Sequence, residues 1–210
     1  MLSVKDPPAP GRPRKRPRLS PFYRQMLFYA LFMVPVCAGL LEVWHSPDHT
    51  QAIVEQQHQF GLYAFRFLLC CLLVSPLRRF ARVDIMVYRR PLGLLAFTYA
   101  CVHAVLYLVW ITHLDTERLR HDFMTHPLFV FGALALLLLS VLAATSTRGA
   151  IRHMGRRWAR LHRLVYVAAV LVSVHFCLAF RTWHIEAFVY AALTVVVLAV
   201  RWLPPKRRER

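Results

Sequence analysis

The chain has 210 residues, of which 58% are hydrophobic and 13% aromatic, and its formal net charge is +17. A soluble domain of this length would not contain so many unbroken apolar runs. A nucleic-acid-binding protein would gather its basic residues on one reader surface, whereas here they are spread along the chain. The composition therefore excludes both classes and indicates a protein that crosses a membrane several times.

Six apolar segments approach the roughly 20 residues that a helix needs to cross a hydrocarbon core about 30 Å thick. Backbone polar groups in lipid must be satisfied within each segment, so we expect an all-α bundle of six transmembrane helices. The segments are residues 26–44, 60–77, 92–111, 127–144, 164–180 and 185–203. No small-residue cleavage site follows the first segment, so it is not expected to be a cleavable signal.

The distribution of basic residues predicts the orientation of these helices. The N-terminal region, the second and fourth connections and the C-terminal tail together contain 22 Lys and Arg residues, whereas the other three connections contain three. By the positive-inside rule, both termini are expected in the cytoplasm. We therefore expect a disordered basic cytoplasmic tail at 1–24, a six-helix domain at 25–203 and a second basic cytoplasmic tail at 204–210.

The connections leave no room for a second domain. None exceeds about 20 residues, and none carries a dinucleotide or phosphate-binding motif. Neither an internal repeat nor a transporter-like pair of broken helices is evident in the sequence. The five cysteines lie inside apolar segments without the spacing of a metal site, so they are expected to be packing residues rather than disulfides.

Two histidines are expected at the same depth. His103, in "YACVHAVLY", and His175, in "LVSVHFCLAF", each lie eleven residues into a segment that runs outward from the cytoplasm. At 1.5 Å per residue, both stand about 17 Å above the cytoplasmic boundary. A single intramembrane histidine is as compatible with a helix–helix hydrogen bond as with a ligand. Two at one depth favour a shared ligand.

Haem fits this pair better than zinc or a proton relay. Zinc would need four ligands, and a relay would need acidic residues that the segments largely lack. Haem needs two axial nitrogens and a wide apolar slot. Helical spacing puts small residues on the two histidine faces, namely Ala96, Ala100, Ala168 and Ala179. No CxxCH motif is present, so the expected group is a non-covalent b-type haem with His103 and His175 as iron ligands.

Two further features are more ambiguous. His162 precedes His175 by thirteen residues, about 20 Å along a helix, and the matching position below His103 is Arg89–Arg90 rather than histidine. His162 therefore belongs either to an unusually ligated second haem or to the membrane interface. Arg66, within the second segment, needs a partner such as a haem propionate, a carbonyl or a lipid phosphate.

Two stretches resemble a known family. "RRPLGLLAFTYACVHAVLY" (89–107) and "ATSTRGAIRHMGRRWARLHRLVYVAAVLVSVHF" (144–176) are similar to the ferric-reductase-like transmembrane domain. Within it, they are most similar to the haem-binding membrane subunits of periplasmic methionine sulfoxide reductase systems. The resemblance implies a six-helix cytochrome b of the bacterial inner membrane, with haem-linked histidines at His103, His162 and His175. Larger relatives have four such histidines, and arginine stands at the fourth position here.

The resemblance also implies a path for electrons. They would come from quinol or a cytoplasmic flavin reductase and pass to a periplasmic molybdopterin-containing partner that reduces methionine sulfoxide in envelope proteins. Flavin mononucleotide is associated with the family, but no residue here can be matched to it. The alternatives are a stand-alone transmembrane ferric or quinol reductase and, from a different class, a non-redox transporter or scaffold.

Overall fold

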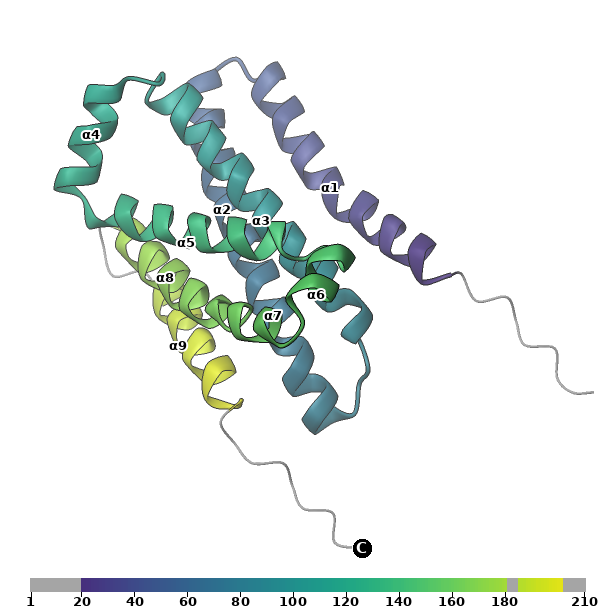
Figure 1. Ribbon diagram of the computed structural model, residues 1–210. Coiled ribbons are helices and arrows are strands. Elements are labelled where there is room, and N and C mark those ends of the chain that lie inside the picture. The colour runs from purple at the N-terminus through teal and green to yellow at the C-terminus, as the bar shows by residue number, and fades with distance from the viewer. Residues whose placement is uncertain (1–19, 181–184, 202–210) are drawn as a thin grey trace, which may run out of the picture.

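The computed structural model describes residues 20–180 and 185–201, which form only helices and their connections (Figure 1). The predictions for residues 1–19 and for the tail at 204–210 lie outside this described part. The main helices are α1 (Pro21–His45), α2 (His49–Pro76), α3 (Arg89–Leu106), α5 (Pro127–Ala144), α8 (Leu164–Ala179) and α9 (Ile185–Ala199). Shorter elements are α4 (Thr116–Thr125), α6 (Arg148–Met154), α7 (Arg156–Leu161), the π-helices η1 (Leu77–Ala81) and η3 (Tyr107–Ile111), and the 3₁₀ turn η2 (Met86–Tyr88).

The all-helical membrane architecture is confirmed. Five helical stretches of the described chain are long and apolar enough to cross a membrane, and the chain is a multi-pass membrane protein. These stretches are Phe22–His45, His49–Ala81, Met86–Ile111, Pro127–Ala144 and Arg156–Ala179. The sixth predicted segment contains α9, a shorter apolar helix of 15 residues.

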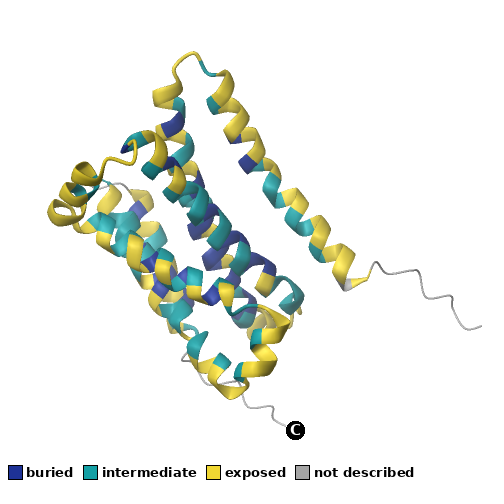
Figure 2. Cartoon of the chain, turned by 45° about the horizontal axis from the view of Figure 1, so that its top comes forward, coloured by how far each residue is buried: buried dark blue, intermediate teal, exposed yellow. Residues whose placement is uncertain are grey.

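Two helix pairs organise the bundle. α2 packs along α3, and α5 packs along α8, while α1 lies at the edge and α9 packs beside α8 (Figure 1). Buried residues concentrate along α2 and α3 (Figure 2). Tyr99 of α3 is fully buried there, and its hydroxyl donates to the carbonyl oxygen of Phe32 in α1 at 2.6 Å. This bond satisfies the one polar atom of the ring and fixes α1 to the core.

The predicted outer loop at 45–59 is wrong, because α2 begins at His49. Asp48 caps this helix by accepting a hydrogen bond from the backbone N–H of Gln51 at 3.0 Å. Gln56 then donates to the carboxylate of Glu42 at 2.8 Å, which ties the polar start of α2 to the end of α1. The predicted disordered tail at 1–24 is also wrong for its last residues, since α1 begins at Pro21, a residue suited to the first turn of a helix.

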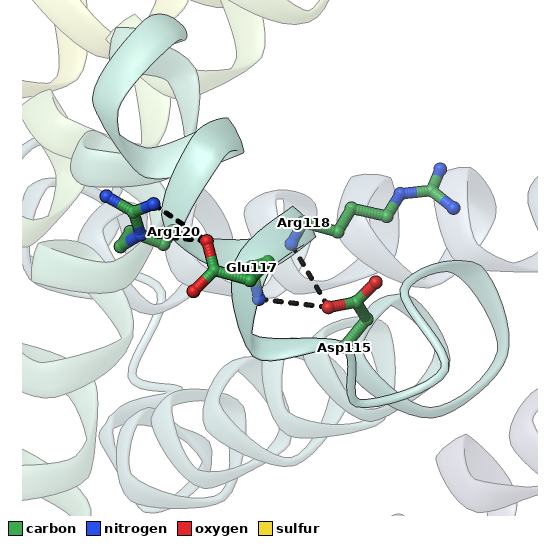
Figure 3. A network of polar contacts seen from close by, with 4 residues as sticks. All are labelled: Asp115, Glu117, Arg118 and Arg120. Carbon is green, nitrogen blue, oxygen red and sulfur yellow. Dashed lines mark hydrogen bonds and ion pairs between the residues drawn. The ribbon is translucent and has the colours of Figure 1, made fainter.

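The connection between α3 and α5 contains α4 rather than an irregular loop. Asp115 caps α4 by accepting from the backbone N–H groups of Glu117 and Arg118, at 2.9 and 3.3 Å (Figure 3). Glu117 pairs with Arg120 at 2.7 Å one turn later. Tyr107 of η3 donates to the carboxylate of Asp122 at 2.6 Å, so α4 is held against the end of the α3 stretch.

Candidate functional site

The structure brings together the two histidines predicted to share a ligand. His103 of α3 and His175 of α8 lie with their ring centroids 6.1 Å apart and their ring planes at 90°. They come from the two different helix pairs, so the site lies where the α2–α3 pair faces the α5–α8 pair. Matching depth, counted in residues from two helix starts, was enough to predict this meeting.

Each ring is oriented by a backbone carbonyl of the neighbouring helix. The Nδ1 atom of His103 lies 2.7 Å from the carbonyl oxygen of Gln57 in α2. The Nδ1 atom of His175 lies 2.8 Å from the carbonyl oxygen of Leu128 in α5. A carbonyl oxygen can only accept, so Nδ1 carries the hydrogen in both rings. The Nε2 atom of each ring therefore keeps its lone pair, which is the form of histidine that binds a metal.

The spacing fits one iron between the two rings. A bond from a metal to an imidazole nitrogen is about 2 Å long, so two rings on opposite sides of one ion have centroids about 6 Å apart. The observed 6.1 Å agrees with this value. The hydrogen bonds from Nδ1 to the two carbonyl oxygens also fit, since ligating histidines commonly donate their other N–H to a carbonyl or carboxylate.

A tetrahedral zinc site is not supported. Nowhere in the described residues do three or more His, Cys, Asp or Glu side chains gather closely enough to hold a metal ion. The pair thus offers two nitrogens and no further protein ligand, as a porphyrin iron requires. The four alanines predicted on the histidine faces differ in burial. Ala96 and Ala168 are fully buried, Ala100 is half-buried, and Ala179 is exposed.

His162 lies apart from this pair, just after α7. Its Nε2 atom is 3.2 Å from the hydroxyl oxygen of Thr145, and its ring stacks on Trp158 with centroids 4.0 Å apart. The indole N–H of Trp158 donates to the carbonyl oxygen of Thr145 at 2.9 Å, which closes a small polar cluster. Arg89, at the start of α3, is close enough to His162 to interact with it electrostatically, whereas Arg90 is exposed.

Arg66 has a partner within the protein. Its Nε atom donates to the hydroxyl of Tyr190 in α9 at 2.7 Å, and its guanidinium lies near the rings of Tyr63 and Tyr190, at 5.7 and 6.0 Å. Gln57, which orients His103, precedes Arg66 by nine residues, so at 100° per residue the two point to different faces of α2. The tyrosine hydroxyl was not among the partners that the sequence suggested.

The two carbonyl groups of Gln57 and Leu128 were not among the predicted site groups. Every residue has a backbone carbonyl, so no residue type marks these positions. Only the packing of α2 against α3, and of α5 against α8, identifies them.

Comparison with known proteins agrees with this geometry. The family model described as the ferric reductase like transmembrane component matches residues 60–173. Among curated proteins, the chain is 40% identical over 154 residues to the protein-methionine-sulfoxide reductase heme-binding subunits MsrQ of Brucella ovis, Brucella canis and Brucella suis. In each case, the match covers 73% of this chain and 70% of the relative. The chain therefore belongs to the MsrQ family of ferric-reductase-like transmembrane proteins.

Proposed function

We propose that this protein is the b-type cytochrome subunit of a methionine sulfoxide reductase system. In this role it carries electrons across the bacterial inner membrane to a periplasmic molybdopterin reductase, MsrP, with which it forms a heterodimer. The reduction of methionine sulfoxide in envelope proteins takes place on that partner. The names of the relatives support this role, and the paired rings of His103 and His175 are the observation that carries it.

The proposed topology has six spans, with α9 as the sixth and both termini in the cytoplasm. The distribution of basic residues supports this orientation, since the α2–α3 connection and the α5–α8 connection, which contains α6 and α7, are rich in arginine. The transmembrane domain then extends over residues 25–203, between a basic N-terminal tail and a basic tail at 204–210. The paired histidines lie in the outer half of the bundle in this orientation.

His103 and His175 are the residues proposed to hold the haem iron. When bound, haem supplies an iron that accepts and releases one electron at a time. The protein's own contribution is to present two Nε2 lone pairs at a fixed separation, and the carbonyl oxygens of Gln57 and Leu128 increase the basicity of both rings. An apolar surrounding would also help to set the reduction potential of a bound haem.

His162 is the proposed ligand of a second haem on the cytoplasmic side, an assignment supported by the family resemblance. Arg89 and Arg90 stand where a fourth histidine would be, and Arg89 is close enough to act on a charged group beside His162. Electrons enter on this side from quinol or from a cytoplasmic flavin reductase. Flavin mononucleotide is a further candidate cofactor that rests on the family resemblance alone.

The first test of the proposal is the absorption spectrum of the purified protein, oxidised and dithionite-reduced. We expect a low-spin b-type spectrum in the wild type and its loss in both His103→Ala and His175→Ala. His45→Ala is a matched control, because this exposed histidine ends α1 and its Nδ1 atom lies 2.8 Å from the carbonyl oxygen of Leu41 in its own helix. A colourless wild-type protein from haem-replete cells would favour the non-redox alternative. A normal spectrum in either axial variant would remove that residue from the assignment.

A second experiment separates the partner-dependent role from a stand-alone ferric reductase. The reduced protein is mixed with a ferric chelate or with the periplasmic molybdoenzyme, and reoxidation is followed optically. We expect rapid reoxidation by the molybdoenzyme and slow reoxidation by the chelate. The reverse order would favour the stand-alone reductase.

A further inference from the structure

Two glycines lie directly against the paired histidine rings. A Cβ atom added at Gly61 in α2 would stand 2.9 Å from Nδ1 and 3.0 Å from Cε1 of His103. A Cβ atom added at Gly132 in α5 would stand 2.7 Å from both Nδ1 and Cε1 of His175. Carbon atoms do not approach ring atoms this closely, so any side chain at either position would displace the ring or separate the helices.

The position of each glycine relative to the orienting carbonyl explains why no side chain is tolerated. Gly61 follows Gln57 by four residues, and Gly132 follows Leu128 by four. Every Cα–Cβ bond in an α-helix tilts toward the N-terminus, so the side chain of residue i+4 lies over the carbonyl of residue i. Glycine at i+4 leaves that carbonyl uncovered. The imidazole N–H can then reach the second lone pair of the oxygen, beside the helical hydrogen bond.

The same arrangement occurs twice in the chain. Gly61 precedes His103 by 42 residues, and Gly132 precedes His175 by 43. In both cases the glycine and the carbonyl belong to the first helix of a packed pair and the histidine to the second. Each pair is joined by an arginine-rich connection, and Ala96 and Ala168 stand seven residues before their histidines, both fully buried. A sequence without an evident repeat thus contains a repeated structural unit.

We propose that Gly61 and Gly132 are positioning residues that seat the two imidazoles on the carbonyl oxygens of Gln57 and Leu128. These glycine and carbonyl contacts fix the separation and the 90° angle of the two ring planes. Their effect on haem binding rests on the proposed haem function. Without the seats, the Nδ1 hydrogen bonds are lost and the Nε2 atoms no longer face one iron. Loss of such an outer-shell contact weakens metal binding by about 10- to 100-fold.

The first test compares glycine variants of the full-length protein purified with haem. Gly61→Ala and Gly132→Ala are each expected to reduce haem binding by about 10-fold or more and to change the low-spin electron paramagnetic resonance signal, which depends on the angle between the two imidazole planes. Gly93→Ala in α3 is the matched control, because its Cβ atom would meet only the Cys71 sulfur at an ordinary 3.6 Å. Wild-type haem content and an unchanged resonance signal in both Gly61→Ala and Gly132→Ala would overturn the proposal.

A second control distinguishes ring seating from general helix packing. Gly39 in α1 is also crowded, since a Cβ atom there would meet Oε1 of Gln56 and stand 2.8 Å from Cζ of Phe60, with no histidine atom among its three nearest neighbours. Gly39→Ala is expected to lower thermal stability while the resonance signal keeps its wild-type form. If Gly39→Ala altered the signal as the seat variants do, crowding alone would explain the effect and the proposal would fail.

The third test needs no haem, so it can fail or succeed independently of the proposed haem function. Apo-protein is prepared from haem-depleted cells, and the melting temperature is measured for wild type, Gly61→Ala, His103→Ala and the double variant. Gly61→Ala is expected to destabilise the protein only when the His103 ring is present, so the two effects are non-additive. Equal destabilisation in both backgrounds would show that the methyl group clashes with something other than the ring. A colourless wild-type protein would refute the haem function. The melting temperatures of the four apo-proteins would then still test whether Gly61 positions the His103 ring.

Discussion

Arg66 is a charged residue within a predicted transmembrane segment, and its contacts can be tested for whether they offset the free energy of placing a charge there. It lies near the middle of the His49–Ala81 stretch, where a guanidinium would otherwise face lipid. Its Nε atom donates to the hydroxyl of Tyr190 at 2.7 Å, and the rings of Tyr63 and Tyr190 lie 5.7 and 6.0 Å from the guanidinium carbon. The sequence suggested a haem propionate as one partner, whereas the structure offers two tyrosines.

The magnitudes indicate that these tyrosines are sufficient. A hydrogen bond to a charged group contributes about 1.5–3 kcal/mol, and each cation–π contact contributes about 0.5–1 kcal/mol. Together they stabilise Arg66 by about 2.5–5 kcal/mol. Placing an arginine at the centre of a transmembrane helix costs about 2.5–3.5 kcal/mol on insertion scales. The two sums nearly cancel, so Arg66 needs no further counter-charge.

Two substitutions follow from this balance. Tyr190→Phe keeps the ring but removes the hydroxyl acceptor, so it should cost about 1.5–3 kcal/mol. For a chain of this size, that lowers the melting temperature by roughly 3–12 °C. Arg66→Leu removes the charge together with its insertion cost, so the melting temperature should stay closer to that of the wild type. Neither substitution should alter haem content.

The assay is thermal unfolding of the detergent-solubilised protein, with haem content measured on the same samples. Tyr63→Phe is the matched control, because Tyr63 contacts Arg66 through its ring and the hydroxyl makes no hydrogen bond to the guanidinium. A larger loss of stability in Arg66→Leu than in Tyr190→Phe would refute the reasoning, since the charge would then have a stronger partner. Loss of haem in Arg66→Leu alone would restore the propionate assignment.

Three further substitutions test the end of the bundle near His162. His162→Ala should lower the ratio of haem to protein while the low-spin spectrum persists, and an unchanged ratio would place His162 only in its cluster with Thr145 and Trp158. Tyr166→Phe should lower the melting temperature by roughly 3–12 °C, because Nη1 of Arg201 donates to the Tyr166 hydroxyl at 2.6 Å. Arg201→Met should cost at least as much, since it removes this bond and also the one from Nη2 to the carbonyl oxygen of Leu72. A smaller loss with Arg201→Met would contradict this account.

Much of the fold could be predicted because lipid restricts both composition and backbone. The segment predicted at 127–144 coincides with α5, whose 18 residues are almost entirely apolar. The start of α2 could not be predicted in the same way. Its first turns are polar, "HTQAIVEQQHQ", and an apolar-run criterion therefore assigns them to a loop. The helix forms there because Asp48 caps it and the contact between Gln56 and Glu42 supports it against α1.

Only the two histidine side chains of the candidate site could be predicted from the sequence. His103 and His175 stand out because an imidazole is costly in an apolar segment and because their depths match. The groups that orient them leave no such signal. The carbonyl oxygens of Gln57 and Leu128 are backbone atoms, and Gly61 and Gly132 look like weak points of a helix rather than parts of a site. A glycine four residues after an uncovered carbonyl is recognisable once the facing helix is known.

The location of the paired histidines bears on the direction of electron flow in the proposed orientation. His175 lies four residues, or about 6 Å along the axis, before the outer end of α8. Leu128, which orients it, is the second residue of α5. His162 lies thirteen residues, or about 20 Å, toward the cytoplasm. Because electron transfer slows exponentially with distance, the pair is well placed to deliver an electron to a periplasmic acceptor and poorly placed to receive one directly from the cytoplasm. A second carrier near His162 would remove that asymmetry, which gives the proposed second haem a physical role in addition to the family resemblance that supports it.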